Sequence, residues 1–306
     1  MQTTLKSSVT FKGVGLHTGA RVCMTIRPAS AEHGIWFCRT DVAHGTGFIA
    51  ARWDNVLSSR LCTQIGNANG VTVSTIEHVM AALAGCGIHN ALVELDGPEV
   101  PILDGSAAPF VAGFVARGFR ELAVPIRALR VLKPVEVREG EALARLEPSD
   151  MLEIDFRIEF DDLAIGKQSK KLNMANGAFV RELSNSRTFC RQQDVDAMRL
   201  NGLALGGTLD NAVVIDGDRV VSPGGFRYPD EAVRHKMLDA LGDLALAGAP
   251  ILGRYVGHRA GHALTNQLLK ALFASPDSFK LVDVSSATLG KLPGAGVTRA
   301  DILTFA

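Results

Sequence analysis

The sequence has no excess of charge of either sign and few aromatic residues. It holds 32 Lys and Arg against 32 Asp and Glu, which gives a formal net charge of zero, and aromatics make up only 6% of the chain. A phosphate backbone is normally bound by surplus positive charge, and unpaired bases by stacking aromatic side chains. The composition therefore argues against nucleic acid as a partner.

Long apolar runs are also missing. The longest, Leu244 to Gly253, contains Gly and Pro and is far shorter than the ~18 residues of a membrane-spanning helix. The N-terminal residues include no apolar region typical of a signal peptide. The five cysteines are widely spaced without a C-x-x-C pair, which favours reduced thiols. We therefore expect a cytoplasmic protein with no transmembrane segment.

The 306 residues are enough for about two domains of roughly 150 residues each. A mixed stretch with two prolines, Arg120 to Pro134, marks the expected boundary and divides the chain into domains 1–125 and 126–306. Each half alternates short β-branched strands with apolar helices, which predicts an α+β fold. The expected strands are 21–27, 35–39, 91–95, 151–160 and the hairpin 213–221. The first expected helix begins after Ser74 and ends at Gly85 or Gly87, and the others are 107–117, 176–184, 230–247 and 261–274.

The helix expected from residue 230 carries His235, Asp239 and Asp243 on one face, opposite its apolar residues. His and Asp four residues apart project side by side, and together they suit Zn²⁺. The competing interpretation is a solvated polar face, which spacing alone favours about two to one because such pairs are common on helix surfaces.

A second candidate is Glu77-His78 at the start of the first domain's helix. Glu77 also completes an S-x-x-E capping box with Ser74, so a purely structural role is a strong alternative. With His235 and Asp239, however, His78 would complete a three-ligand metal site with one open position. A carboxylate beside such a site can take a proton from water during hydrolysis.

Two weaker candidates follow. His258, in the segment Gly257-His-Arg-Ala-Gly261-His262, could serve as a mobile general acid; the competing interpretation is that His258 is a loop residue and His262 opens the last helix. A metal pair of His258 and His262 at i,i+4 is disfavoured, because Gly261 interrupts a continuous helix. Thr188, in Ser-Arg-Thr-Phe, has a hydroxyl that could stabilise an oxyanion beside a metal, although Ser and Thr also favour turns.

Several segments, taken together, resemble the zinc-dependent UDP-3-O-acyl-N-acetylglucosamine deacetylases of lipid A synthesis in Gram-negative bacteria. The segments are VTFKGVGLHTG, STIEHVMAAL, VPILDGSAAPFV, SRTF, RHKMLDALGDL and GHRAGHALTNQLL, in this order over nearly the whole chain. The resemblance implies two similar domains, each a helix layer on a β-sheet, with the helices facing each other. It also implies an insert, here about 189–215, that forms a passage for the acyl chain.

The resemblance also implies roles for individual residues. It gives zinc ligands at His78, His235 and Asp239, a general base at Glu77 and an oxyanion stabiliser at Thr188. It further implies His258 as the general acid, Asp243 as the carboxylate that orients it, Lys236 as a substrate-binding cation and Phe189 as a residue stacking on the substrate. Cys190 stands where many relatives are expected to have Gly.

From the residues alone, three functions fit: a zinc amidase on a small acetylated substrate, a zinc peptidase, or a nucleotide-sugar-binding module with structural histidines. The open metal position disfavours the last, and the missing H-E-x-x-H pattern disfavours the peptidase. The resemblance favours hydrolysis of the N-acetyl group of UDP-3-O-acyl-N-acetylglucosamine, with Zn²⁺ as cofactor. No obligate protein partner is evident.

Overall fold

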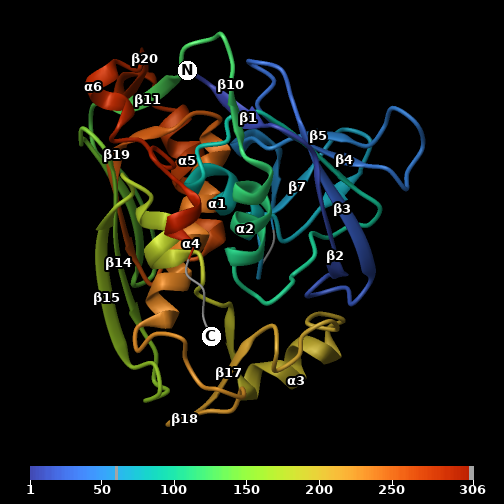
Figure 1. Ribbon diagram of the computed structural model, residues 1–306. Helices are drawn as coiled ribbons and strands as arrows, with labels where there is room; N and C mark the ends of the chain where they lie inside the picture. Colours follow the sequence, from blue (N-terminus) through green and yellow to red (C-terminus); the bar gives the residue numbers. More distant parts are fainter. Residues whose placement is uncertain (59–60, 303–306) are drawn as a thin grey trace.

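The computed structural model describes residues 1–58 and 61–302. Two larger β-sheets stand on opposite sides of a layer of helices (Figure 1). The first is five-stranded, in the order β2-β3-β9-β4-β5, and comes from the first half of the chain. Its strands are β2 (Val9–Val14), β3 (Arg21–Pro28), β4 (Ile35–Arg39), β5 (Phe48–Ala50) and β9 (Ala91–Leu95).

The second large sheet is seven-stranded and comes from the second half of the chain. Its path runs β12-β13-β19-β11-β20, and β14 joins β19 to the edge strand β15. The strands are β11 (Arg127–Val131), β12 (Val135–Glu139), β13 (Ala142–Glu147), β14 (Leu152–Glu159), β15 (Lys167–Asn173), β19 (Ile251–His258) and β20 (Phe279–Asp283).

Smaller sheets complete the strands. β1 (Thr3–Leu5) pairs with β10 (Phe119–Glu121), and β6 (Val56–Leu57), β7 (Gln64–Gly66) and β8 (Thr72–Val73) form a second small sheet. A third contains β16 (Phe189–Arg191), β17 (Val213–Asp216) and β18 (Arg219–Val220). With helix α3 (Gln192–Leu200), this third sheet forms the insert at the lower end of the molecule in Figure 1.

The helices between the large sheets position the site. α1 (Glu77–Gly85) and α4 (Glu231–Leu244) pack directly on each other, and α5 (His262–Phe273) packs on α4. α2 (Ala108–Arg117) lies against α1 and β2, and α6 (Ser286–Leu289) is a single turn near the end of the chain. A short π-helical segment spans Phe179–Leu183.

The α+β prediction is confirmed, since strands and helices alternate in both halves. The expected strands at 35–39 and 91–95 match β4 and β9 to the residue. The strand predicted at 151–160 is β14, which pairs antiparallel with β15 and parallel with β19. The division into domains 1–125 and 126–306 stays a prediction.

The predicted capping box at Ser74 is wrong. The N-cap of α1 is Ile76, and no side chain caps it. The Ser74 hydroxyl accepts a hydrogen bond from Gln64, and the Glu77 carboxylate instead accepts one from the backbone N–H of Thr63 at 3.0 Å. Glu77 is therefore held by tertiary contacts and not by local capping.

The solvated-face interpretation of α4 is also wrong. His235, Asp239 and Asp243 are all buried, as are the apolar residues on the other side of the helix. Both faces are covered because α4 lies between α1 and the seven-stranded sheet. Gly242 permits the close crossing, since an added Cβ there would overlap the carbonyl oxygen of Glu77.

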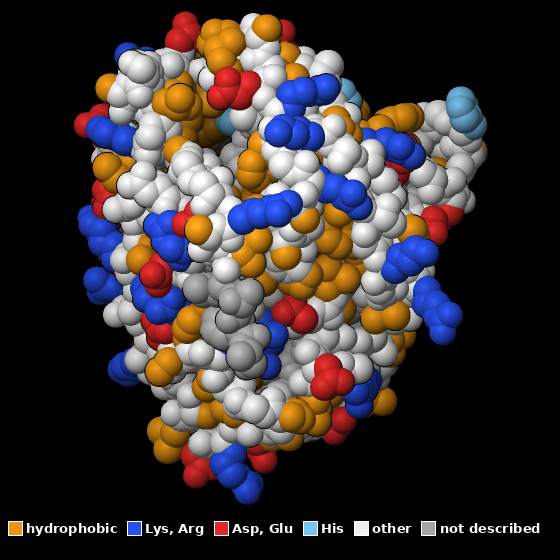
Figure 2. All heavy atoms as spheres, in the orientation of Figure 1, with side chains coloured by type: hydrophobic (Ala, Val, Ile, Leu, Met, Phe, Trp, Pro, Cys, Tyr) orange, Lys and Arg blue, Asp and Glu red, His pale blue; other side chains and the backbone are white. Residues whose placement is uncertain are grey.

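The molecular surface carries both signs of charge. On the face drawn in Figure 2, basic and acidic side chains are spread over the surface, and an apolar area lies beside α2. None of the helices formed by residues 1–58 and 61–302 combines the length and the hydrophobicity that a membrane span requires.

The α1–α4 crossing leads to a stability prediction. Gly242→Ala should lower the free energy of unfolding by about 1–3 kcal/mol, because the methyl group meets rigid backbone and overpacks the crossing. Urea denaturation monitored by circular dichroism measures the change. Gly290→Ala is the control, since its methyl group would lie in open space, and equal effects of the two substitutions would contradict the prediction.

Candidate active site

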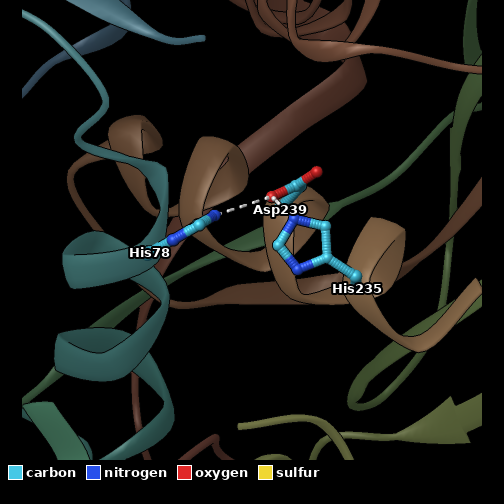
Figure 3. A group of neighbouring side chains, drawn as sticks. All are labelled: His78, His235 and Asp239. Atoms are coloured by element: carbon cyan, nitrogen blue, oxygen red, sulfur yellow. Dashed lines mark ion pairs between the residues drawn. The ribbon is translucent and has the colours of Figure 1, made fainter. Parts of the chain in front are cut away.

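Three side chains from the two crossing helices form a candidate metal site. His78 extends from α1, and His235 and Asp239 extend from adjacent turns of α4 (Figure 3). The Asp239 Oδ1 atom lies 3.6 Å from His78 Nε2 and 3.4 Å from His235 Nε2. One ligand atom from each residue lies within 4.8 Å of the others, which is close enough to share one ion.

The surroundings of these residues suit a bound cation. Asp239 Oδ1 is buried and has no hydrogen-bond partner among the described residues, whereas Asp239 Oδ2 accepts a hydrogen bond from Lys236 Nζ at 2.7 Å. His235 Nδ1 lies 3.1 Å from the carbonyl oxygen of Ser186. An Nδ1–H donated to that carbonyl leaves Nε2 free as a ligand.

Burial keeps both imidazoles neutral and ready to bind a metal. It lowers the pKa of His78 to about 3, and it lowers the pKa of His235 as well. Burial alone would raise the pKa of Asp239, but the neighbouring histidines and Lys236 lower it, so this carboxyl group is ionised. Two neutral nitrogens and one carboxylate oxygen are therefore presented together.

Glu77 begins α1 immediately before His78 and is buried. Burial raises the pKa of its carboxyl group to about 7, with His262 opposing the shift and Asp239 and Asp243 adding to it. A carboxyl group that titrates near neutral pH can exchange a proton with water under physiological conditions.

His262, and not His258, completes this cluster. Its Nδ1 lies 2.9 Å from Asp243 Oδ2, and its Nε2 lies 3.9 Å from Glu77 Oε1 and 3.8 Å from Asp239 Oδ2. Burial alone would lower the pKa of His262, but the three surrounding carboxylates raise it to about 9. His262 is therefore a charged imidazolium near neutral pH, held by a buried carboxylate.

The structure does not bring His258 to the site. His258 is the last residue of β19, where it pairs with Leu143 of β13 and with Arg157 of β14. The predicted pairing of Asp243 with His258 is therefore corrected to a pairing with His262. The two histidines separate because His258 still belongs to the sheet, whereas His262 opens α5 after Gly261.

The cluster opens into a cavity of about 1020 Å³. Thr188, Phe189 and Lys236 line the cavity, as the sequence led us to expect. The Phe189 ring centroid is 6.2 Å from that of His235, so this aromatic lies beside the candidate metal site. Arg187, anchored on the buried Glu231 at 2.9 Å, fixes the segment that carries both Thr188 and Phe189.

The insert supplies much of the apolar lining of the cavity, but some of its leucines do not line the cavity. Met198 and Leu203 line the cavity together with Val195, Leu209 and Val214. Leu200 and Leu205 do not: they are 88% and 55% exposed. Cys190 also lines the cavity, and burial raises the pKa of its thiol.

Two further residues near the cluster, His17 and Thr63, are not among those predicted from the sequence. His17 lines the cavity and is buried, and neither ring nitrogen has a hydrogen-bond partner among the described residues. Thr63 donates its backbone N–H to Glu77 and its hydroxyl to Asp243, which ties the two helices together. No local pattern marks Thr63, but His17 belongs to the segment GLHTG on which the family resemblance partly depends.

Comparisons with known proteins agree with this geometry. A family model described as UDP-3-O-acyl N-acetylglycosamine deacetylase matches residues 2–274. A protein of Phenylobacterium zucineum named UDP-3-O-acyl-N-acetylglucosamine deacetylase is 51% identical over 280 residues, covering 92% of this chain and 96% of that protein. Proteins of the same name from Shewanella frigidimarina and Shewanella loihica are each 45% identical over 283 residues, with 92% of each chain covered. The chain belongs to the UDP-3-O-acyl N-acetylglycosamine deacetylase family.

Proposed function

We propose that this protein hydrolyses the N-acetyl group of UDP-3-O-acyl-N-acetylglucosamine to give the free amine and acetate, a step of lipid A synthesis in the cytoplasm. One observation carries the proposal: the metal-ligand set, a carboxyl group with a pKa near 7 and an imidazolium converge at the end of one apolar-lined cavity. Family membership supports the same substrate.

The residues present fit zinc as the cofactor. His78, His235 and Asp239 would hold the ion through two nitrogens and one oxygen, which is the ligand type and number of catalytic zinc sites. When bound, zinc acts as a Lewis acid that polarises a carbonyl oxygen. We propose that the two halves of the chain are two domains. Because the ligands come from both halves, the ion would also hold the two domains together.

Glu77 and His262 would divide the proton transfers between them. Hydrolysis adds water across the amide: the water oxygen bonds to the acetyl carbon, and the C–N bond breaks. Glu77 would accept the proton that water loses, and His262, already protonated, would donate one to the departing nitrogen. An amide anion is a very poor leaving group, so this second transfer is essential.

Other residues lining the cavity would bind and orient the substrate. The Thr188 hydroxyl would donate a hydrogen bond to the developing oxyanion, and Lys236 would provide a positive charge close to the reacting carbonyl. Phe189 offers a flat apolar surface to the sugar, and the apolar wall of the insert would take the 3-O-acyl chain. A sugar nucleotide with an acyl chain matches a cavity that is polar at one end and apolar at the other.

The alternative is a zinc amidase or peptidase that acts on a different acylated substrate. No feature of the site favours it specifically, whereas the apolar wall and the family assignment favour the acylated sugar nucleotide. Acetate release from UDP-3-O-acyl-N-acetylglucosamine by the purified protein tests the proposal. No release by zinc-loaded protein, or equal release from an unrelated acetylated peptide, would reject it.

The first prediction from the proposed function concerns the metal. Asp239→Ala and His235→Ala should each lower bound zinc and acetate release together, because each removes one of three ligands. Metal content by atomic emission and activity are measured on the same preparations. Asp155→Ala is the control, since Asp155 is also buried but pairs with Arg254 in the sheet. Full zinc with full turnover in Asp239→Ala would show that the ligand assignment is wrong.

The second prediction concerns pH. The pH profile of kcat/KM should be bell-shaped: activity falls at low pH as Glu77 gains a proton and at high pH as His262 loses one. Asp243→Asn removes a carboxylate that raises the pKa of His262, so the basic limb should move to lower pH by about 1–3 units.

His262→Ala and His258→Ala form the matched pair for this prediction. His262→Ala should reduce turnover by about 10²–10⁴-fold with zinc retained, which is the usual effect of losing one proton-transfer group. His258→Ala should keep both limbs of the pH profile, because His258 lies in the sheet. The assignment fails if the two variants behave in the opposite way.

The third prediction concerns the acyl chain. Met198 and Leu200 lie on the same helix, but only Met198 lines the cavity. Met198→Ser should reduce kcat/KM for the acylated substrate, and this loss should shrink as the acyl chain is shortened, since each buried CH₂ contributes roughly 0.8 kcal/mol. Leu200→Ser should leave kcat/KM unchanged at every chain length. Equal efficiency of the wild-type protein with and without the 3-O-acyl group would contradict an acyl passage.

A further inference from the structure

Glu99 is a buried carboxylate close to the active site that the reaction itself does not use. It follows β9 and is 1% exposed. Its side chain accepts four hydrogen bonds from two separate segments, and all four donors are neutral. The donors are the backbone N–H of His17 at 2.9 Å, the backbone N–H of Thr18 at 2.8 Å, the Thr18 hydroxyl at 2.7 Å and the Thr75 hydroxyl at 2.8 Å.

The first of these segments carries His17 into the cavity. Gly15 lets the loop approach closely, because a Cβ at that position would overlap the Glu99 carboxylate. The carbonyl oxygens of Leu16 and His17 accept hydrogen bonds from Gly206 at 3.0 Å and Leu205 at 3.1 Å, both in the insert. The position of this loop therefore affects the imidazole of His17 and the insert that covers the cavity.

The second segment leads directly into α1, the helix that carries Glu77 and His78. Thr75 has a φ of 58°, a left-handed conformation that is unfavourable for a β-branched residue and persists only when its surroundings impose it. Two residues later α1 begins with Glu77 and His78. The hydrogen bond from the Thr75 hydroxyl to Glu99 is one of the contacts that hold this strained turn.

Backbone contacts hold the same region without the Glu99 side chain. Ser74 accepts a hydrogen bond from Val100 and donates one to Pro98, and Gly15 pairs with Pro101 in a short antiparallel bridge. Loss of the carboxylate should therefore leave the fold intact and shift only residues 16–18 and the turn at Thr75. Such a local effect would distinguish a positioning role of Glu99 from a role in the stability of the whole fold.

We propose that Glu99 is a positioning residue for the deacetylation reaction: its carboxylate sets the loop that presents His17 and the strained turn that aims Glu77 and His78 at the cavity. The inference rests on the proposed function. It assigns Glu99 no contact with the substrate and no proton transfer. Its effect should therefore appear in the rate of the chemical step.

The central experiment compares Glu99→Gln with Glu94→Gln in zinc-loaded protein, using acetate release. A glutamine amide has only one acceptor oxygen, so in either orientation its NH₂ group faces a backbone N–H donor of the loop. We expect kcat to fall about 10–100-fold in Glu99→Gln, as for a small misplacement of catalytic groups, with zinc content retained and KM changed less than kcat. Glu94 pairs with Arg27 on the sheet surface, so Glu94→Gln should match the wild type.

A second pair of variants covers the case in which Glu99→Gln fails to fold. Thr75→Val keeps the shape and β-branching of Thr75 but removes the hydroxyl that Glu99 accepts, whereas Thr75→Ser keeps the hydroxyl. We expect kcat to fall in Thr75→Val and to be largely retained in Thr75→Ser. A lower melting temperature with unchanged kcat per folded molecule, in Glu99→Gln or Thr75→Val, would overturn the proposal.

Amide hydrogen exchange gives a readout that does not depend on the substrate. The N–H groups of His17 and Thr18 should be protected in the wild type and exchange faster in Glu99→Gln, while the N–H of Val100 stays protected by Ser74. Unchanged protection at His17 and Thr18 would reject the positioning role even if kcat fell. An inactive wild type would reject the proposed function, and the exchange data would still decide whether Glu99 sets the loop.

Discussion

The close crossing of α1 and α4 is the contact on which the site depends. Because Gly242 has no side chain, the backbone of α4 approaches the first turn of α1, and His78 comes within reach of His235 and Asp239. Neither helix carries all three residues of the candidate metal site, so neither half of the chain could form it alone. The crossing also buries Glu77 and Asp243, and charges in such a place are tolerated only when partners surround them.

Within that buried cluster, the neighbours of each carboxyl group decide whether its pKa is lowered or raised. Asp239 lies among His78, His235 and Lys236, so its pKa is lowered and it is a permanent anion suited to a metal. Glu77 is buried away from water and lies next to two other carboxylates, so its pKa rises to about 7 and it can exchange protons. These opposite shifts in neighbouring carboxyl groups support the proposed roles of Asp239 as a metal ligand and Glu77 as a base. His262 is kept charged by the same three carboxylates.

Sequence patterns predicted most of the elements and most of the residues that lie together in the candidate site, and their failures have physical causes. The i,i+4 spacing of His235 and Asp239 indicated a candidate metal pair, but only tertiary burial of both faces of α4 excludes a solvated face. The residues from Ser74 to Glu77 fit a capping box, but the Glu77 carboxylate accepts a hydrogen bond from the backbone N–H of Thr63, which lies outside the helix. Contacts as distant in sequence as those of Thr63 with Asp243 leave no periodicity to detect.

The prediction paired Asp243 with His258, whereas the structure pairs it with His262, and the backbone between the two histidines explains the difference. Between them, Arg259 adopts a φ of 49° and donates its N–H to the carbonyl of Arg157, so the chain turns sharply before α5 begins. The same arrangement precedes α1, where Thr75 has a φ of 58°. In both places a strained residue that is not glycine comes before a helix whose first residue, Glu77 or His262, faces the cluster. The positive end of each helix favours the carboxylate of Glu77 and disfavours the imidazolium of His262. The two groups proposed to accept and to donate protons thus each begin a helix that follows a residue with a positive φ, and the carboxylates around His262 keep it charged.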